Sequence, residues 1–202
     1  MKKILSLVLA LSLCLCLGVT AFAAEVNTNG GTGSTPVSLS STDDGTMSGK
    51  PAATAMSVTV PTVFPMAMAQ NGDVTTATDC KIVNNSYGPV RVKSVTINAA
   101  NGWKLTAFGN KSTLANEKVD SNKFGFSVTI GGGTAVKTDA SNASTQKLIA
   151  SPVTGCYMSG VGNTSGNSIS IQYNAIVTPL SAPVTNANIA NVVFVIEWDT
   201  AA

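Results

Sequence analysis

Apolar and polar residues alternate most densely over residues 80–108. Within this run the apolar, β-branched positions are Val90, Val92, Val95 and Ile97. Polar residues stand between most of them, which is typical of a strand with one buried and one solvated face. The apolar phase is even-numbered before Lys93 and odd-numbered after Ser94, so the strand contains one extra residue. The pattern therefore predicts a β-bulge, or a bend where the strand passes between two sheets.

Other segments repeat this period of two. Asn101-Gly102 is a hairpin-turn signal, and we expect a strand to return after it through Trp103 and Leu105. Further strands of clean alternation are expected over residues 124–130 and 169–177. The last run, NVVFVIEWD at residues 191–199, is apolar on both faces until Glu197, which predicts a central position in a sheet.

The folded part is expected to begin near Met56 with a strand that prolines interrupt. Pro61 and Pro65 remove backbone donors there, so this strand belongs at a sheet edge. The turn signals along the chain separate about eight to ten strands, and no amphipathic helix stands out. These features predict an all-β fold, a β-sandwich of the jelly-roll kind, over residues 56–202.

The N-terminal quarter of the chain has a different character. Residues 1–23 resemble a secretory signal peptide, with Lys2 and Lys3 before an apolar core and Ala21-Phe22-Ala23 as the cleavage site. Residues 24–55 are rich in Gly, Ser and Thr and predict a flexible linker, either a spacer or a segment that becomes ordered on a neighbouring subunit. We therefore expect a secreted protein, extracellular or cell-wall associated, without a lipid anchor or a membrane span in the mature chain.

The low charge and the absence of histidine exclude several classes of function. Lys2 and Lys3 account for the formal net charge of +2, so the mature chain is formally neutral and offers no basic field for nucleic acid. Only 11% of residues are charged, which suits a protein that assembles or sits in a wall or matrix. The absence of histidine removes the usual general base and most catalytic zinc sites. We therefore expect no enzymatic activity, no cofactor and no metal.

Cys80 and Cys156 are the two cysteines of the mature chain. An even number of cysteines in an exported protein favours a disulfide, and this one would close a long loop and stabilise the fold by roughly 4 kcal/mol. The alternative is a pair of free, buried thiols in separate strands or loops.

Two further pairs of side chains are candidates for a site. Glu197 and Asp199 lie on one face of the final strand, about 7 Å apart along it. Paired carboxylates at such a separation serve glycoside hydrolysis, although exposed carboxylates at the end of a strand are the ordinary case. Tyr87 and Tyr157 stand in turn-like contexts and are the candidate contacts for a ligand, because an aromatic ring combines an apolar face with polar edges.

Four segments carry a resemblance to known families. They are SVTVPT at residues 57–62, KIVNNSYGPVRVKSVTI at 81–97, NGWKL at 101–105 and VVFVIEWD at 192–199. Together they resemble secreted surface proteins of Gram-positive Firmicutes, and more loosely the camelysin/TasA-type biofilm matrix proteins and the WxL-type wall-binding domains. The TasA likeness implies a jelly-roll subunit that forms fibres by donating an N-terminal strand to the next subunit. The chain departs from these families in having a single Trp-x-Leu match, no HExxH motif and no LPxTG signal.

The sequence thus supports two hypotheses of different classes. The first is a non-enzymatic structural protein of the cell surface or extracellular matrix that self-associates through an edge strand. The alternative is an adhesin or binding module for a glycan, a cell-wall component or a host protein, which would use loops such as residues 109–123 or 154–167.

Overall fold

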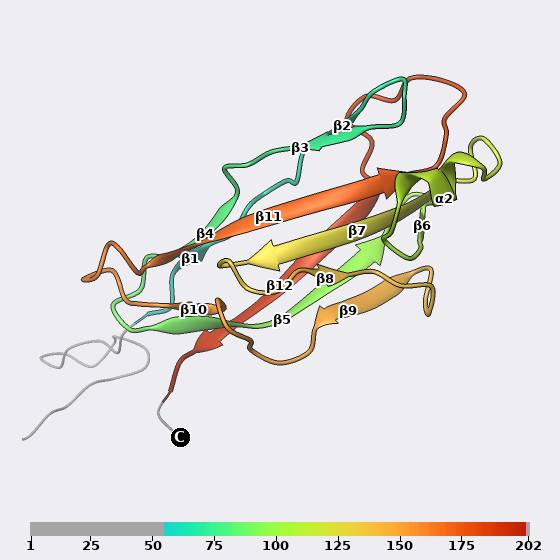
Figure 1. Ribbon diagram of the computed structural model, residues 1–202. Coiled ribbons are helices and arrows are strands. Elements are labelled where there is room, and N and C mark those ends of the chain that lie inside the picture. The colour runs from blue at the N-terminus through green and yellow to red at the C-terminus, as the bar shows by residue number, and fades with distance from the viewer. Residues whose placement is uncertain (1–54, 201–202) are drawn as a thin grey trace, which may run out of the picture. The chain divides into compact units, whose positions relative to one another are not determined.

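The computed structural model describes residues 55–200 (Figure 1). The expected signal peptide and residues 24–54 of the expected linker lie outside this part. The regular structure of the described chain is almost entirely strand, and two sheets, antiparallel except for one short parallel pair, enclose a common apolar core. The all-β sandwich predicted from the alternating pattern is therefore confirmed.

The first sheet has six strands. Its main order is β1 (Val58–Thr59), β4 (Lys81–Asn84), β11 (Ser168–Val177), β7 (Lys123–Ile130) and β6 (Lys104–Leu105), and β8 (Val136–Lys137) also pairs with β7. β11 and β7 form its centre and pair antiparallel from Ile171 opposite Ile130 to Val177 opposite Phe124. The remaining strands of this sheet have four residues or fewer.

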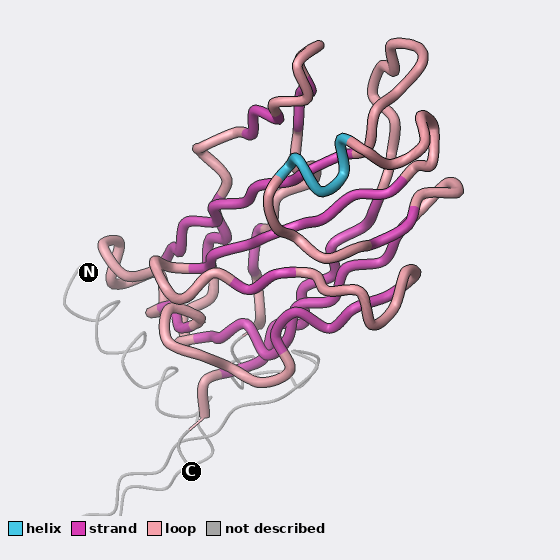
Figure 2. The backbone as a smooth tube through the Cα atoms, turned by 45° about the vertical axis from the view of Figure 1, so that its right-hand side comes forward, coloured by secondary structure: helices cyan, strands magenta, loops and turns pink. Residues whose placement is uncertain are grey.

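The second sheet is organised around one long strand, β5 (Val90–Ala99). On one side β5 pairs with β12 (Ala190–Trp198), and on the other with β10 (Tyr157–Met158) and β9 (Thr145–Ile149). A separate hairpin joins β2 (Met66–Met68) to β3 (Val74–Thr76). The helix α2 (Lys111–Ala115) is one short segment, drawn in cyan among the loops at one end of the molecule in Figure 2.

The bulge predicted in β5 is present. Val195 of β12 lies opposite Ser94, and the next residue, Ile196, lies opposite Val92, so Lys93 is the extra residue. Because Lys93 is an extra residue, the even-numbered apolar side chains before it and the odd-numbered ones after it point to the same face of the strand. As a result Val90, Val92, Val95 and Ile97 are all fully buried.

The core between the sheets combines these residues with the inward faces of β7 and β11. Its largest fully buried side chains include Phe124, Ile171 and Met158. An aromatic cluster at one side joins the two sheets: the ring of Phe64 lies 4.7 Å from that of Tyr173, 6.4 Å from that of Phe126 and 6.2 Å from that of Phe194 (centroid to centroid). Phe64 belongs to the segment between β1 and β2. Both prolines of this segment lie outside the strands, so the single edge strand predicted there is divided into β1, at the edge of the first sheet, and β2, in the separate hairpin.

Two sequence predictions about strand partners are wrong. Asn101 and Gly102 do form a turn with positive φ angles of 50° and 81°, but the returning strand β6 does not pair with β5. It pairs with β7, in parallel, in the other sheet. Both edges of β5 are already occupied, so the chain has to leave that sheet after the turn.

β12 is also placed differently from the prediction. It stands at the end of the strand order and pairs only with β5 in the described part of the chain, so it is an edge strand and not a central one. The strand number differs as well, since residues 55–200 form twelve strands, six of them only two or three residues long.

Candidate functional site

The free edge of β12 is the most unusual surface of the described chain. The strand is nine residues long, and no other strand among residues 55–200 pairs with its outer side. Val193 and Val195 point away from the core and are 45% and 43% exposed. A long apolar strand with unpaired N–H and C=O groups is a template for pairing with another strand.

The inward side of β12 is also incompletely covered. Its side chains Val192, Phe194, Ile196 and Trp198 pack against the core but are only partly buried. The neighbouring β5, in contrast, buries Val90, Val92, Val95 and Ile97 completely, and among its inward apolar residues Ala99 is partly buried. The core is therefore fully covered around β5 and incompletely covered along β12, which is the open side of the sandwich, and the edge presents apolar side chains on both faces of the strand.

A cluster of charges stands at the C-terminal end of this edge. Arg91 donates from Nε to Oε1 of Glu197 at 2.8 Å, and its Nη1 lies 3.4 Å from Oδ1 of Asp199. Lys93, the residue inserted by the bulge, places its Nζ 2.9 Å from the other oxygen of Glu197. Register explains the contacts, because Arg91 lies directly opposite Glu197. Two cations thus neutralise two carboxylates.

This cluster does not resemble the carboxyl pair of a glycosidase. Hydrogen bonds from Lys93 and Arg91 lower the pKa of Glu197 below its ordinary value, and the same contact with Glu197 raises the pKa of Arg91. A general acid in glycoside hydrolysis needs a raised pKa instead, so that it still holds its proton near neutral pH. The geometry gives Glu197 and Asp199 the role of ion-pair partners between β5 and β12.

The lowered pKa of Glu197 leads to a pH prediction. Its folded-state pKa lies below the ordinary 4.5, so the ionised carboxylate stabilises the fold above about pH 4.5 and this contribution is lost as the pH falls through the folded pKa. The carboxyls of Asp73, Asp120 and Asp139, whose pKa values are lowered by hydrogen bonds, act in the same direction. We expect the melting temperature to drop below about pH 4.5. Thermal melts between about pH 7 and pH 3 measure it, and Glu197→Gln should reduce the drop. A melting temperature that stays constant over this range contradicts the prediction.

Comparisons of this chain with protein-family models, with curated proteins and with solved structures found no match. The candidate site therefore rests on its own geometry, and the resemblance to matrix and wall-binding proteins stays a prediction.

The two tyrosines predicted as ligand contacts are both exposed. Tyr87 is 82% and Tyr157 47% exposed. Their segments meet, since the N–H of Val161 donates to the carbonyl of Ser86 at 2.9 Å, and Tyr157 lies opposite Arg91 in the sheet. Neither ring pairs with another aromatic ring in the described part of the chain. The two rings thus occupy the same end of the molecule without forming a stacking platform.

The two cysteines are free thiols, and each stands just before a strand of a different sheet, Cys80 before β4 and Cys156 before β10. The carbonyl of Cys80 accepts a hydrogen bond from Ile171 of β11, and that of Cys156 accepts one from Val92 of β5. The disulfide that the sequence favoured is therefore not formed, and the alternative of two separate thiols describes the structure. Sequence could not decide this, because it gives the number of cysteines but not the distance between them.

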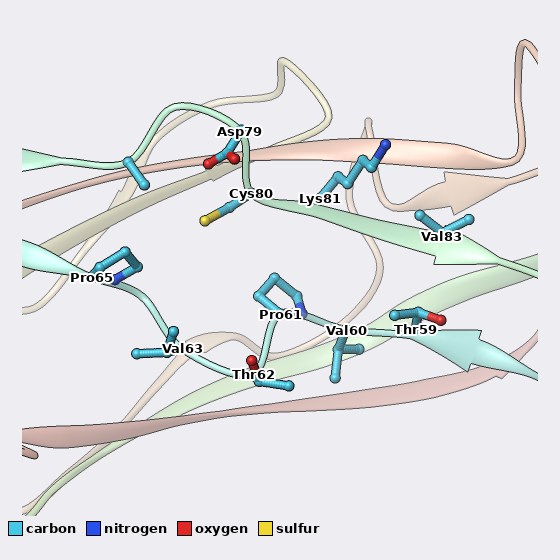
Figure 3. A pocket seen from close by; sticks show the side chains of 11 residues that line it. Thr59, Val60, Pro61, Thr62, Val63, Pro65, Asp79, Cys80, Lys81 and Val83 are labelled. Carbon is cyan, nitrogen blue, oxygen red and sulfur yellow. The ribbon is translucent and has the colours of Figure 1, made fainter.

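Cys80 borders a pocket of about 450 Å³ between residues 59–65 and 77–83. Figure 3 shows its thiol pointing into this pocket, below Asp79 and facing the proline-containing segment. Tyr173 holds the two walls together, because its hydroxyl donates to the carbonyl of Pro65 at 2.6 Å and accepts from the N–H of Ala77 at 3.2 Å. Burial, and secondly the charge of Asp79, raise the pKa of the Cys80 thiol, which makes it a weaker nucleophile at neutral pH.

A larger groove of about 1540 Å³ opens beside the N-terminal end of β12. Its lining includes residues 61–72, which contain β2, and residues 179–192, which lead into β12, together with the aromatic residues Trp103, Phe124 and Phe126. Lys111 is the one charged residue in its described lining, and its ammonium is paired with Asp73. The groove offers apolar surface that continues toward the open side of β12.

No helix among the described residues has the length and hydrophobicity needed to cross a membrane. The same part of the chain contains no cluster of three or more acidic, cysteine or histidine side chains that could hold a metal ion.

Sequence reasoning missed the two features that define the edge. It identified Glu197 but not its partners Arg91 and Lys93, because their proximity depends on the pairing of β5 with β12. It also took the outward valines of β12 for buried residues. The signal that could have shown the edge is Glu197 itself, since an outward charge on an apolar strand is a feature of edges that face solvent.

Proposed function

We propose that this protein is a secreted, non-enzymatic structural protein of the cell surface or extracellular matrix that self-associates through the free edge of β12. One observation carries the proposal: a nine-residue edge strand, apolar on both faces, has no pairing partner in the described chain. Pairing with a second strand would satisfy its backbone groups and cover its exposed valines.

The other edge strands of the described fold are shorter or less regular than β12. β1, β6, β8 and β10 have two residues each, and β9 is interrupted by an irregularity in register next to Val95. Short and bulged edges are the usual protection against unwanted pairing. The long edge at β12 lacks this protection, which is what a surface selected for association requires.

Composition also supports this function. A chain with 11% charged residues has little electrostatic repulsion to oppose contact between copies. The signal-peptide pattern at residues 1–23 predicts export, and the lack of histidine leaves fewer routes to catalysis. A role that depends on backbone pairing needs no reactive side chain.

The test is self-association of the mature chain, residues 24–202, measured by sedimentation velocity and electron microscopy. We expect the wild type to associate and the double variant Val193→Lys and Val195→Lys to remain monomeric, because charges on an edge strand prevent pairing. Both positions are exposed, so the variant should keep the fold, which circular dichroism checks. The matched control is Val119→Lys and Val153→Lys, two exposed valines off β12 that are 55% and 44% exposed.

Two outcomes would contradict the proposal. In the first, the wild type stays monomeric at every concentration tested. In the second, the β12 double variant associates as strongly as the control. Deletion of residues 24–54 separates the contribution of the expected linker: assembly that survives this deletion but not the lysine pair places the contact on β12.

A further inference from the structure

The geometry points to a specific partner for the edge: we propose that β12 pairs antiparallel with β12 of a second copy of this chain, about a two-fold axis normal to the sheet and centred at Phe194. This inference rests on the proposed function and defines its contact. The second sheets of the two copies would join into one continuous sheet across the axis.

Two backbone hydrogen bonds show which groups of β12 are available. The N–H of Asp199 donates to the carbonyl of Pro89 at 3.0 Å, and the carbonyl of Ile189 accepts from the N–H of Ala100 at 2.9 Å. Residues that bond to a neighbour alternate along an antiparallel strand with residues that point away from it. Both bonds, one at each end of β12, assign the odd-numbered residues to β5. The even-numbered residues therefore present their N–H and C=O groups to the free edge.

These available groups suit a symmetric antiparallel pair. A two-fold axis at Phe194 brings Phe194 opposite Phe194 of the second copy and Val192 opposite Ile196. All of these are even-numbered residues, so each pair can exchange backbone hydrogen bonds. Phe194 is also the midpoint of Ala190–Trp198, so this register pairs the strand over its full length and leaves no unpaired residue at either end.

The outward side chains are complementary in the same register. Val193 of each copy lies opposite Val195 of the other copy. The two exposed valines of each copy are therefore covered by those of its partner. Asn191, which is exposed, lies opposite Glu197 of the second copy, where its amide can donate to the carboxylate. The two neutralised charge clusters, one from each copy, come to lie at opposite ends of the contact. They are about 20 Å apart along the strand direction.

Side chains on the inward face favour the pairing as well. Phe194 and Ile196 are only partly buried within one copy, although they belong to the core cluster. In the pair, Phe194 meets its own symmetry mate, and aromatic cross-strand pairs contribute to sheet stability. The pairing would therefore bury the apolar surface that the open side of the sandwich leaves exposed.

A parallel arrangement fits the edge less well. A symmetric parallel pair needs a two-fold axis along the strands, which turns one sheet over and joins the inward face of one copy to the outward face of the other. The antiparallel arrangement keeps apolar faces together.

Cysteine cross-linking tests the register. Val193→Cys and Val195→Cys are made as separate proteins of different mass, each on residues 24–202, and are oxidised alone and as a mixture. Directly opposite residues that do not exchange hydrogen bonds have close side chains, within reach of a disulfide. We expect the mixed dimer to form several-fold faster than either homodimer, on the order of ten-fold where geometry is the limit. The unsubstituted chain measures any background bridge through Cys80 or Cys156.

Each other outcome has a defined meaning. Rapid homodimers of both variants without excess mixed dimer, or a rapid homodimer of one variant alone, would indicate a different register; either result overturns the proposed register while the edge contact stands. Association of the proteins without any cross-link above background overturns the pairing of β12 with itself. A chain that does not associate before oxidation contradicts the proposed function itself, and sedimentation velocity of the reduced proteins detects this separately.

Discussion

Replacing Phe64 by alanine is expected to lower the free energy of unfolding by about 3 kcal/mol, because the ring joins both sheets at the open side of the sandwich. It contacts the rings of Tyr173 and Phe126 in the first sheet and of Phe194 in the second. The estimate lies at the low end for a phenylalanine in a core, since this side chain is only partly buried. Chemical denaturation of residues 24–202, followed by tryptophan fluorescence, measures the change.

The neighbouring Val63 provides the matched control for this prediction. Its side chain is 65% exposed, so Val63→Ala should change the free energy of unfolding by less than about 0.5 kcal/mol. Equal losses for the two variants would show that Phe64 does not join the sheets as described.

Replacing Gly131 by alanine should destabilise the protein by a similar amount, about 3 kcal/mol. Gly131 has a φ of 56°, which costs about 1 kcal/mol for a residue with a side chain. In addition, its Cβ would lie 2.2 Å from the carbonyl oxygen of Gly155, so the turn after β7 and the segment before β10 would have to move apart at a further cost of about 1–3 kcal/mol.

Gly132 separates these two contributions. It also has a positive φ, 74°, but a Cβ there would meet no atom within 4 Å. Gly132→Ala is therefore expected to cost only about 1 kcal/mol. If the two alanine variants unfold at the same denaturant concentration, the close approach of Gly131 and Gly155 does not limit stability.

Much of the fold follows from local patterns in the sequence. The change of apolar phase at Lys93 predicted the bulge in β5 correctly, because a buried face requires its side chains at every second position and an extra residue is visible as a shift. The prolines at positions 61 and 65 predicted an interrupted strand for a similar local reason, since a residue without N–H cannot complete a ladder, and the structure does break the segment there into β1 and β2. Such features depend on a single strand and need no knowledge of its partners.

The parts that sequence could not provide all depend on partners. The turn at Asn101-Gly102 was predicted, but which strand β6 would join depends on the occupied edges of β5. The ion cluster around Glu197 depends on the register between β5 and β12. The separation of Cys80 from Cys156 depends on the assignment of the strands that follow them, β4 and β10, to different sheets.

The position of β12 shows why apolar patterning is ambiguous. Val193 and Val195 give the same pattern whether a strand is covered by a second layer of its own chain or by another molecule, because both environments remove apolar surface from water. The pattern correctly indicated that β12 has two apolar faces. It incorrectly placed the strand in the centre of a sheet of its own chain. An edge built for association resembles a strand from the interior of a domain when only the sequence is read.

The short strands at the far side of the second sheet limit how far a joined sheet can extend. Beyond β5 that sheet ends in β10, with two residues, and in β9, with five residues and an irregular register. A two-fold contact through β12 uses up the one long free edge that residues 55–200 offer in each copy, and it is closed by its own symmetry. Growth beyond a dimer therefore requires a second, different contact between copies. The stability of any larger assembly would be limited by that second contact.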